Sequence, residues 1–302
     1  MNLSKKKINL KEIKAQSNAI KIYKDMKDYR MNAYNFSDQH DESAAHDKKA
    51  MRETIDRMLA DKYGMVLHAG DWGDKHRHTI RTAKLKLFSD DFEEPIQQTK
   101  EIVERLKPRI EIWQELKKMA YGFLGAVAGN HFEWMFFRDG KYGTRVVNSI
   151  QYMCEQTGVP YLGETVGILK ICFNVKGGST ISMPIVVDHT SKYCSSDEAD
   201  VRELERLLDK YSFADLVFAA HTHRKTFKKK LYPHPLFARG KIIQKVRCAV
   251  RAGSYLKTYM ENQSTYSERR GYSMLETGTP RVDVRFRKSD GDMFIKSMEV
   301  RL

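Results

Sequence analysis

Long apolar runs are missing from this chain of 302 residues. No stretch approaches the roughly 18 consecutive apolar residues that a membrane-spanning helix needs. The first residues are polar and rich in lysine, without the apolar segment of a secretory signal. We therefore expect a cytoplasmic protein with no membrane partner.

Cysteine is scarce, and its four positions, Cys154, Cys172, Cys194 and Cys248, contain no C-x-x-C pair. This scatter indicates reduced thiols in a cytoplasmic protein, and we expect Cys172 and Cys248 to face a core. Internal repeats and low-complexity linkers are absent as well. With 41% hydrophobic residues, the length suits one large α/β domain or two smaller ones. We prefer one domain, 31–302, after a basic helical arm, 1–30.

Acidic residues are absent from one long stretch, 224–251, which holds ten of the 53 Lys and Arg residues. The whole chain carries a formal net charge of +14. Basic stretches attract polyanions, although a solvated basic surface would have the same composition. The first candidates for nucleic-acid contact follow directly on a His pair and are Arg224, Lys225, Lys228, Lys229 and Lys230.

Periodic apolar residues predict an alternation of helices and strands, and hence an α/β fold with mixed sheets. The expected helices are 10–29, 47–61 capped by Asp47, 95–119 kinked or split at Pro108, 144–157 and 197–210. The expected strands are 33–37, 65–69, 121–128, 159–162, 166–175, 180–187, 215–220, 225–232, 241–250, 281–287 and 293–300. The consecutive strands between 159 and 187 should be antiparallel, with a turn at Gly177-Gly178. The strands around 33–37 and 65–69 should be parallel, because right-handed crossovers favour that arrangement.

Five of these apolar runs end in Asp, Asn or His, side chains that bind divalent metals. The run 34–37 leads into Asp38-Gln39-His40, and 66–69 leads into Gly70-Asp71-Trp72-Gly73-Asp74. The other three lead into Gly129-Asn130-His131, Asp188-His189 and His221-Thr222-His223. Ligands of α/β sheets bind beyond the carboxyl ends of strands, so these side chains form a candidate site. A further H-x-H, His76-Arg77-His78, is more typical of a polar loop.

The order D-x-H, G-D-x-x-D, G-N-H, H and H-x-H over residues 34–223 resembles the calcineurin-like metallophosphoesterase superfamily. The resemblance implies a β-sandwich of mixed sheets flanked by helices, completed by C-terminal strands within 225–300. It also implies two divalent metal ions bridged by Asp71. Asp38, His40 and His223 would complete one ion site, and Asn130, His189 and His221 the other. His131 would protonate the leaving oxygen, and Asp74 would orient His131.

Two positions depart from the family pattern. An acid usually follows the His of G-N-H directly, but here Phe132 intervenes before Glu133, which puts the supporting role of that acid in doubt. Ala220 stands where Gly usually precedes the last His pair, and alanine is costly only at positive φ. Neither change removes a ligand, so the metal site should be intact.

The motifs therefore predict a metal-dependent phosphoesterase, with manganese as the favoured metal and iron, zinc or magnesium as alternatives. The basic stretch beside the site favours a phosphodiesterase or nuclease acting on nucleic acid. A phosphomonoesterase acting on nucleotides or phosphoproteins is the alternative enzyme. A nucleic-acid-binding module with an idle metal site is the alternative outside enzymes. Oligomeric state is left open. A Tyr-rich segment, 255–272, either shapes a substrate edge or packs as a loop.

Overall fold

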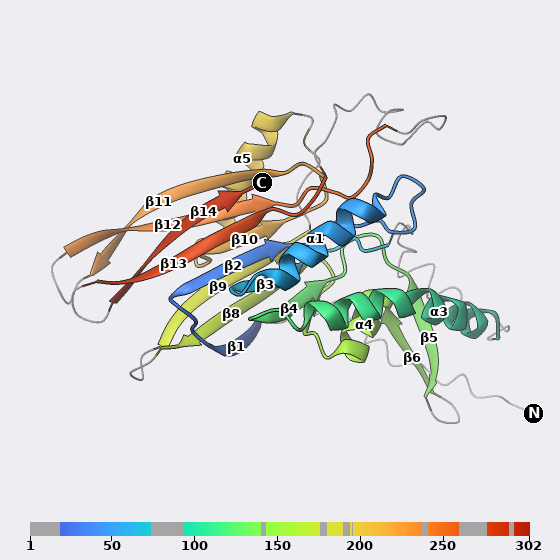
Figure 1. Cartoon of the computed structure of the whole chain (residues 1–302). Coiled ribbons are helices and arrows are strands. Elements are labelled where there is room, and N and C mark those ends of the chain that lie inside the picture. The colour runs from blue at the N-terminus through green and yellow to red at the C-terminus, as the bar shows by residue number, and fades with distance from the viewer. Residues whose placement is uncertain are drawn as a thin grey trace, which may run out of the picture.

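Two six-stranded mixed sheets pack face to face in the computed structural model, with helices on the outside (Figure 1). The structure describes residues 19–73, 93–139, 143–175, 180–189, 194, 196–236, 241–259, 277–289 and 293–302. The predicted fold class, an α/β sandwich of mixed sheets flanked by helices, is confirmed.

The first sheet has the strand order β1-β8-β9-β10-β12-β11. Its strands are β1 (Ala19–Asp25), β8 (Val166–Asn174), β9 (Thr180–Asp188), β10 (Leu216–Ala219), β11 (Thr226–Leu236) and β12 (Lys241–Arg251). The second sheet has the order β14-β13-β2-β3-β4-β7. Its strands are β2 (Arg30–Asn35), β3 (Gly64–His68), β4 (Gly122–Val127), β7 (Tyr161–Gly163), β13 (Arg281–Ser289) and β14 (Met293–Arg301). The remaining strands, β5 (Trp134–Asp139) and β6 (Gly143–Asn148), form a separate hairpin.

Alternate residues of the strands enter different cores, as the period of two requires. In β3, Met65 and Leu67 pack between the two sheets, whereas Val66 faces the helices on the outside. Those helices are α1 (Lys48–Ala60), α3 (Glu93–Leu116) and α4 (Ser149–Thr157), which all cover the second sheet. Helix α5 (Asp197–Lys210) covers the first sheet through a smaller apolar cluster. Both sheets are therefore buried on both faces near their centre.

The parallel strands that precede the motifs lie side by side. Strands β2, β3 and β4 are mutually parallel neighbours, and β9 and β10 are parallel neighbours in the other sheet. The predicted parallel pairing of β2 with β3 and antiparallel pairing of β8 with β9 are both confirmed. The carboxyl ends of five strands consequently meet at one edge of the sandwich.

The predicted N-terminal helix is wrong where the structure describes it, because residues 19–25 form strand β1. Ile20 and Ile22 alternate with Lys21 and Tyr23, and this period of two lets β1 add to the sheet edge parallel to β8. Residues 1–18, the rest of the predicted arm, lie outside the described residues, as does the turn at 177–178.

Two further predictions are wrong in part. The expected helix 144–157 begins only at Ser149, after the Asn148 side chain caps it, because Val146 and Val147 belong to the hairpin strand β6. The strand near 159–162 pairs parallel with β4 of the other sheet instead of antiparallel with β8. Helix α3 runs unbroken through Pro108, so the alternative of a split at that residue is excluded.

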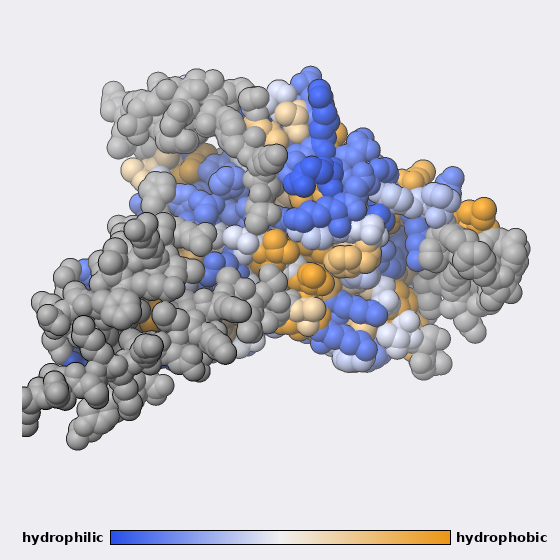
Figure 2. All heavy atoms as spheres, turned by 180° about the vertical axis from the view of Figure 1, so that it is seen from behind, coloured by the Kyte–Doolittle hydropathy of each residue, from blue (hydrophilic) through white to orange (hydrophobic). Residues whose placement is uncertain are grey.

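The exposed surface mixes hydrophilic and hydrophobic residues. Figure 2 shows hydrophilic side chains over much of the described face opposite to Figure 1, with one central group of hydrophobic residues. Among the described helices, none combines the length and the hydropathy that a bilayer crossing requires. All four cysteines are buried free thiols, as the sequence predicts for Cys172 and Cys248.

Candidate metal centre

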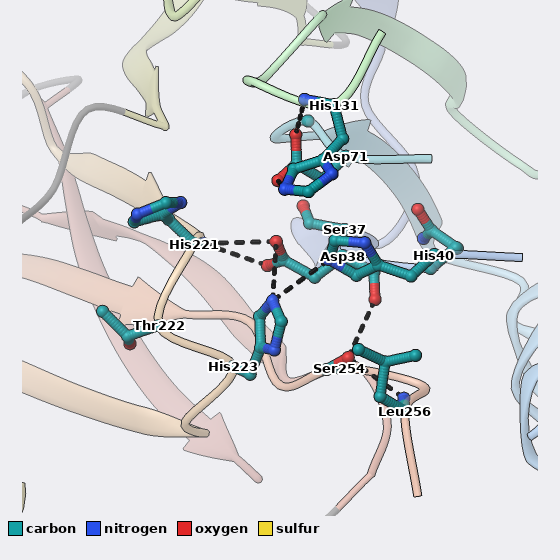
Figure 3. Close-up of polar contacts among 12 residues, drawn as sticks. Ser37, Asp38, His40, Asp71, His131, His221, Thr222, His223, Ser254 and Leu256 are labelled. Atoms are coloured by element: carbon teal, nitrogen blue, oxygen red, sulfur yellow. Dashed lines mark hydrogen bonds and ion pairs between the residues drawn. The ribbon is translucent and has the colours of Figure 1, made fainter. Parts of the chain in front are cut away.

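The predicted ligands gather where the carboxyl ends of strands from the two sheets meet (Figure 3). Asp38, His40 and His223 form one group, whose potential ligand atoms all lie within 4.8 Å of one another. Asp71, His189 and His221 form a second group by the same measure. These are the two sets that the sequence resemblance assigns to two ions, apart from Asn130. Each group combines residues from both sheets, so the site spans the sandwich.

Asn130 joins the second group through its amide oxygen. The Oδ1 atom of Asn130 lies 2.8 Å from Nε2 of His189, and Oδ2 of Asp71 lies 3.0 Å from the same nitrogen. The other ring nitrogen, Nδ1, donates a hydrogen bond to the carbonyl of Ala69 at 2.6 Å. When a bound cation displaces the Nε2 proton, the lone pair of Nε2 is left directed at the same position as the two oxygens. A divalent cation among these three atoms would satisfy all of them, so the residues fit a metal ion.

The first group has a similar arrangement of donor atoms. The Nε2 atoms of His40 and His223 face each other at 3.1 Å, and Nε2 of His223 lies 3.7 Å from the Asp38 carboxylate. Two imidazoles and a carboxylate suit manganese, iron or zinc better than calcium. The donor chemistry therefore fits a divalent ion here as well, without fixing which one.

The loops that carry these residues have unusual backbones. Among described non-glycine residues, only seven have positive φ, and five of those are Asp38, His40, Asp71, His221 and His223. Left-handed backbone costs of order 1 kcal/mol or more for such residues and persists where surrounding contacts enforce it. The strain is concentrated at the predicted ligands, which is typical of a functional site.

Hydrogen bonds hold these backbones in place. The carbonyl of Asp38 accepts bonds from Ser254 Oγ at 3.1 Å and from the Tyr255 amide at 3.3 Å. The Asp38 carboxylate accepts the His221 amide at 3.1 Å, which ties the two sheets together (Figure 3). Ser254 has no sequence signal that would have identified it. Tyr255 is buried, so this part of the Tyr-rich segment packs in the core rather than shaping a substrate edge.

Asp71 is held by the loop that carries His131. Its Oδ1 atom accepts the backbone amides of Asn130 at 2.7 Å and His131 at 2.8 Å. The His131 ring packs edge-on against the His40 ring, with 4.9 Å between centroids, and its side chain is 15% exposed. His131 can therefore reach a substrate while Asp71 stays buried. Asp74, its predicted orienting partner, lies outside the described residues, as does the His76-Arg77-His78 loop.

Burial and mutual charge shift the pKa values of these groups. Burial raises the pKa of Asp38 to about 7. Burial opposes the charge of both His189 and Asp71, but their attraction outweighs it. The pKa of His189 rises to about 9 and that of Asp71 falls. Burial lowers the pKa of His221 to about 4 and lowers that of His223, so both rings are neutral, as metal ligation requires.

His68, which the motifs do not include, lies buried behind the site. Its Nδ1 atom accepts the Gly70 amide at 3.3 Å, and Nε2–H donates to Oε1 of Gln39 at 2.9 Å. The ring packs against Trp72 and Trp113 at 5.5 and 5.7 Å between centroids. His68 thus links the Asp38 and Asp71 loops.

The basic stretch after His223 is largely ion-paired with helix α5. Arg224 lies 2.5 Å from Asp197, Lys228 lies 3.4 Å from Glu205, and Lys230 lies 2.8 Å from Asp209. Among the other candidates, Lys229 lies 5.8 Å from the centre of the Phe227 ring. The stretch 224–251 contains no acidic residue, so the sequence did not indicate these partners, which belong to helix α5.

Two arginines at the end of the same stretch are structural. Arg247 donates to the backbone carbonyls of Leu208, Ala214 and Tyr211, which fixes the end of α5 to β12. Arg251 is fully buried and contacts Asp200 at 3.3 Å and Thr222 at 3.0 Å. Since Thr222 separates His221 from His223, Arg251 supports the loop of the His pair.

No family model and no curated protein matches the sequence. Solved structures do match, and each of the following covers 90% of this chain. Vps29 of Entamoeba histolytica, crystallised with zinc, has 12% identity, a TM-score of 0.36 and 98% of its own length covered. A predicted phosphoesterase of Streptococcus pneumoniae has 12% identity, a TM-score of 0.34 and 98% coverage. A calcineurin-like phosphoesterase of Bacillus subtilis has 11% identity, a TM-score of 0.39 and 90% of its own length covered. At this degree of similarity, the resemblance to the superfamily rests on the five motifs and their geometry.

Proposed function

We propose that this protein is a two-metal phosphoesterase of the calcineurin-like superfamily. The convergence of Asp38, His40 and His223 in one group and of Asp71, His189 and His221 in another carries this proposal. Ions held by these groups would stabilise phosphoryl charge and supply a nucleophile at neutral pH. Manganese is the metal we would test first, and iron, zinc and magnesium are the alternatives.

The chain's own residues have distinct roles in this proposal. Asp71 would bridge the two sites and Asn130 would complete the second one. His131, which is less buried than Asp71, would donate a proton to the leaving oxygen as general acid. Asp74 would orient His131 through a carboxylate–imidazole hydrogen bond.

As substrate we propose the phosphodiester bonds of nucleic acid. The net charge of +14 supports a polyanionic substrate, and Arg224, Lys225, Lys228, Lys229 and Lys230 follow the His pair directly. Exposed ion pairs are worth at most about 1 kcal/mol, so phosphates could compete with the α5 carboxylates for Lys228 and Lys230. The free thiols suit a reducing compartment, which supports a cytoplasmic location.

A phosphomonoesterase acting on nucleotides or phosphoproteins is the second candidate. The observation that favours it is the pairing of Arg224, Lys228 and Lys230 with α5, which gives these cations a structural role without any polymer. A binding module with an idle site is the third possibility, and the complete ligand set weighs against it.

The experiment that separates these functions compares two esters with manganese present. Wild type and Asp71→Asn are assayed on bis-p-nitrophenyl phosphate and on p-nitrophenyl phosphate. Diester hydrolysis that disappears in the variant would support the phosphodiesterase. Hydrolysis of the monoester alone would move the assignment to a phosphomonoesterase. Failure to hydrolyse either ester with metal bound would favour the binding module.

The salt dependence of binding then tests whether the substrate is a nucleic acid. Binding of single- and double-stranded oligonucleotides is measured from about 50 to 200 mM salt with Asp71→Asn, which keeps the surface charge of the basic stretch. Contacts to several phosphates release counterions, so affinity should fall by about tenfold or more over this range. An affinity that does not change with salt would exclude nucleic acid as the substrate.

A further inference from the structure

Two loops of the site are linked from outside by one side chain of helix α3. The Nη1 atom of Arg105 lies 2.6 Å from Oε1 of Glu42. Its Nη2 atom lies 2.9 and 2.8 Å from the two carboxylate oxygens of Glu133. Glu42 comes two residues after His40, and Glu133 comes two residues after His131. Arg105 therefore spans the loops of a proposed metal ligand and of the proposed general acid.

The relative position of the His40 and His131 rings depends on the distance between these two loops. The rings of His40 and His131 meet edge to face, 4.9 Å apart at 84°. On the inner side, Asp71 accepts the His131 amide with its carboxylate and the His40 amide with its backbone carbonyl at 3.4 Å. Arg105 supplies the matching connection on the outer side. If Glu133 shifted, the backbone of residues 131–133 would rotate about the hydrogen bond between the His131 amide and Asp71, and the His131 ring would move.

We propose that Arg105 is a positioning residue that acts through Glu133 to hold His131 at the leaving oxygen. The inference rests on the proposed phosphoesterase function and on the role of His131 in it. It also gives a role to Glu133, the acid that stands one position later than the family pattern has it. Phe132, which is buried against Trp134, fills the intervening position, so Glu133 turns outward to α3.

The chemistry of the pair favours positioning over stability. The Arg105 side chain is 38% exposed, and ion pairs at such sites add little to folding free energy. The planar guanidinium nevertheless holds two carboxylates at a fixed spacing, Glu42 through Nη1 and Glu133 through Nη2, which a single ammonium nitrogen does not. Loss of Arg105 should therefore change the reaction more than the fold.

The test uses aryl esters of graded leaving-group pKa, of whichever class wild type hydrolyses. Nitrophenolates leave without a proton, whereas phenol or alkyl leaving groups need the general acid. Arg105→Ala should lose about 10- to 100-fold in kcat on poor leaving groups and little on nitrophenyl esters. The dependence of log kcat on leaving-group pKa should become steeper in Arg105→Ala, and Arg105→Lys should not restore the wild-type slope.

Further variants make the test specific. His131→Ala should show the same pattern with a larger loss, and adding Arg105→Ala to it should cause no further loss. Glu133→Gln breaks the same pair from the other side and replaces Arg105→Ala if that variant fails to fold. Arg52→Ala removes a similarly exposed arginine, which pairs with Asp56 and Glu115 on the helices, and should leave the slope unchanged.

Each outcome decides the proposal. A steeper leaving-group dependence that vanishes in the His131→Ala background supports it. A uniform loss on all esters, or an unchanged slope, overturns the positioning role while wild-type activity leaves the proposed function standing. Wild type that hydrolyses no ester with metal bound overturns the proposed function itself.

Discussion

The Nε2 atoms of His40 and His223 face each other at 3.1 Å, although one residue follows strand β2 of one sheet and the other follows β10 of the second sheet. A cation held between these nitrogens would connect the two sheets. Metal binding should therefore stabilise the whole fold and not only a loop.

We predict that manganese raises the thermal midpoint and that a chelator lowers it. A ligand at about 100 times its Kd adds about 2.7 kcal/mol, which corresponds to roughly 4–5 °C for a chain of this size. Differential scanning calorimetry with manganese and with EDTA measures the shift. His223→Ala should lose most of it. Equal midpoints with manganese and with EDTA in wild type would contradict a metal link between the sheets.

Gly129 has no room for a side chain beside Asp71. It has φ +85°, and an added Cβ would clash with the Asp71 carboxylate. We predict that Gly129→Ala displaces Asp71 and lowers both metal content and esterase activity at least tenfold. Metal content is measured by atomic emission after dialysis.

Gly278→Ala is the matched control for that substitution. Gly278 has φ +114°, but an added Cβ would meet no atom of the described residues within 4 Å. It isolates the backbone cost, about 1 kcal/mol or more, from the displacement of the carboxylate. If both variants lost metal equally, the contact with Asp71 would not be the cause.

Arg109 neutralises two carboxylates beside the site. Its Nη2 atom lies 2.7 Å from Asp41 and 2.9 Å from Glu42, and its side chain is only 9% exposed. Removing one partner of a buried ion pair costs about 3–5 kcal/mol, and here Asp41 would lose its cationic partner, whereas Glu42 would keep Arg105. We therefore predict that Arg109→Ala lowers the free energy of unfolding by that amount in urea titrations.

Arg105→Ala is the comparison for Arg109→Ala, since Arg105 lies one turn earlier on α3 and is 38% exposed. It should cost only about 0–1 kcal/mol. A loss of similar size in both variants would mean that burial does not set the cost at Arg109.

The sequence predicted which motif residues come together better than it predicted the residues that support them. Strand ends carrying Asp, Asn or His were visible as motifs, and the ligand sets followed from the family resemblance. Ser254, Arg105 and Arg251 act through contacts between residues far apart in the chain, which no local pattern records. The acidic partners of Lys228 and Lys230 were not predicted for the same reason. They lie on α5, which precedes the basic stretch in the chain and packs beside it.

The errors in the fold have a related cause. Residues 19–25 fit either a loose helical period or an alternation of two, and residues 143–148 have β-branched residues without a clear period. Pairing with β8 or with β5 decides for the strand in each case. The strands of two other hairpins, β8 with β9 and β13 with β14, alternate more clearly and were predicted correctly, whereas strand β5 of the β5–β6 hairpin was missed.

His68 should make the protein sensitive to acid. Burial lowers the pKa of His68 to about 3, whereas the unfolded chain has a histidine pKa near 6.5. Between these two values the unfolded state binds more protons, so stability falls as the pH drops from about 6.5 towards 3. The full effect is of order 4–5 kcal/mol at about 1.36 kcal/mol per pKa unit.

The measurement is the free energy of unfolding of wild type and His68→Gln in urea, at pH 7 and at pH 5. The introduced glutamine would keep a donor towards Gln39 without a group that titrates. The difference in stability between the proteins should favour wild type at pH 7 and shrink by about 2 kcal/mol at pH 5. Other titrating groups, Asp38 among them, contribute to both proteins and cancel in this difference. A difference that does not vary with pH would show that His68 is not held neutral by its burial.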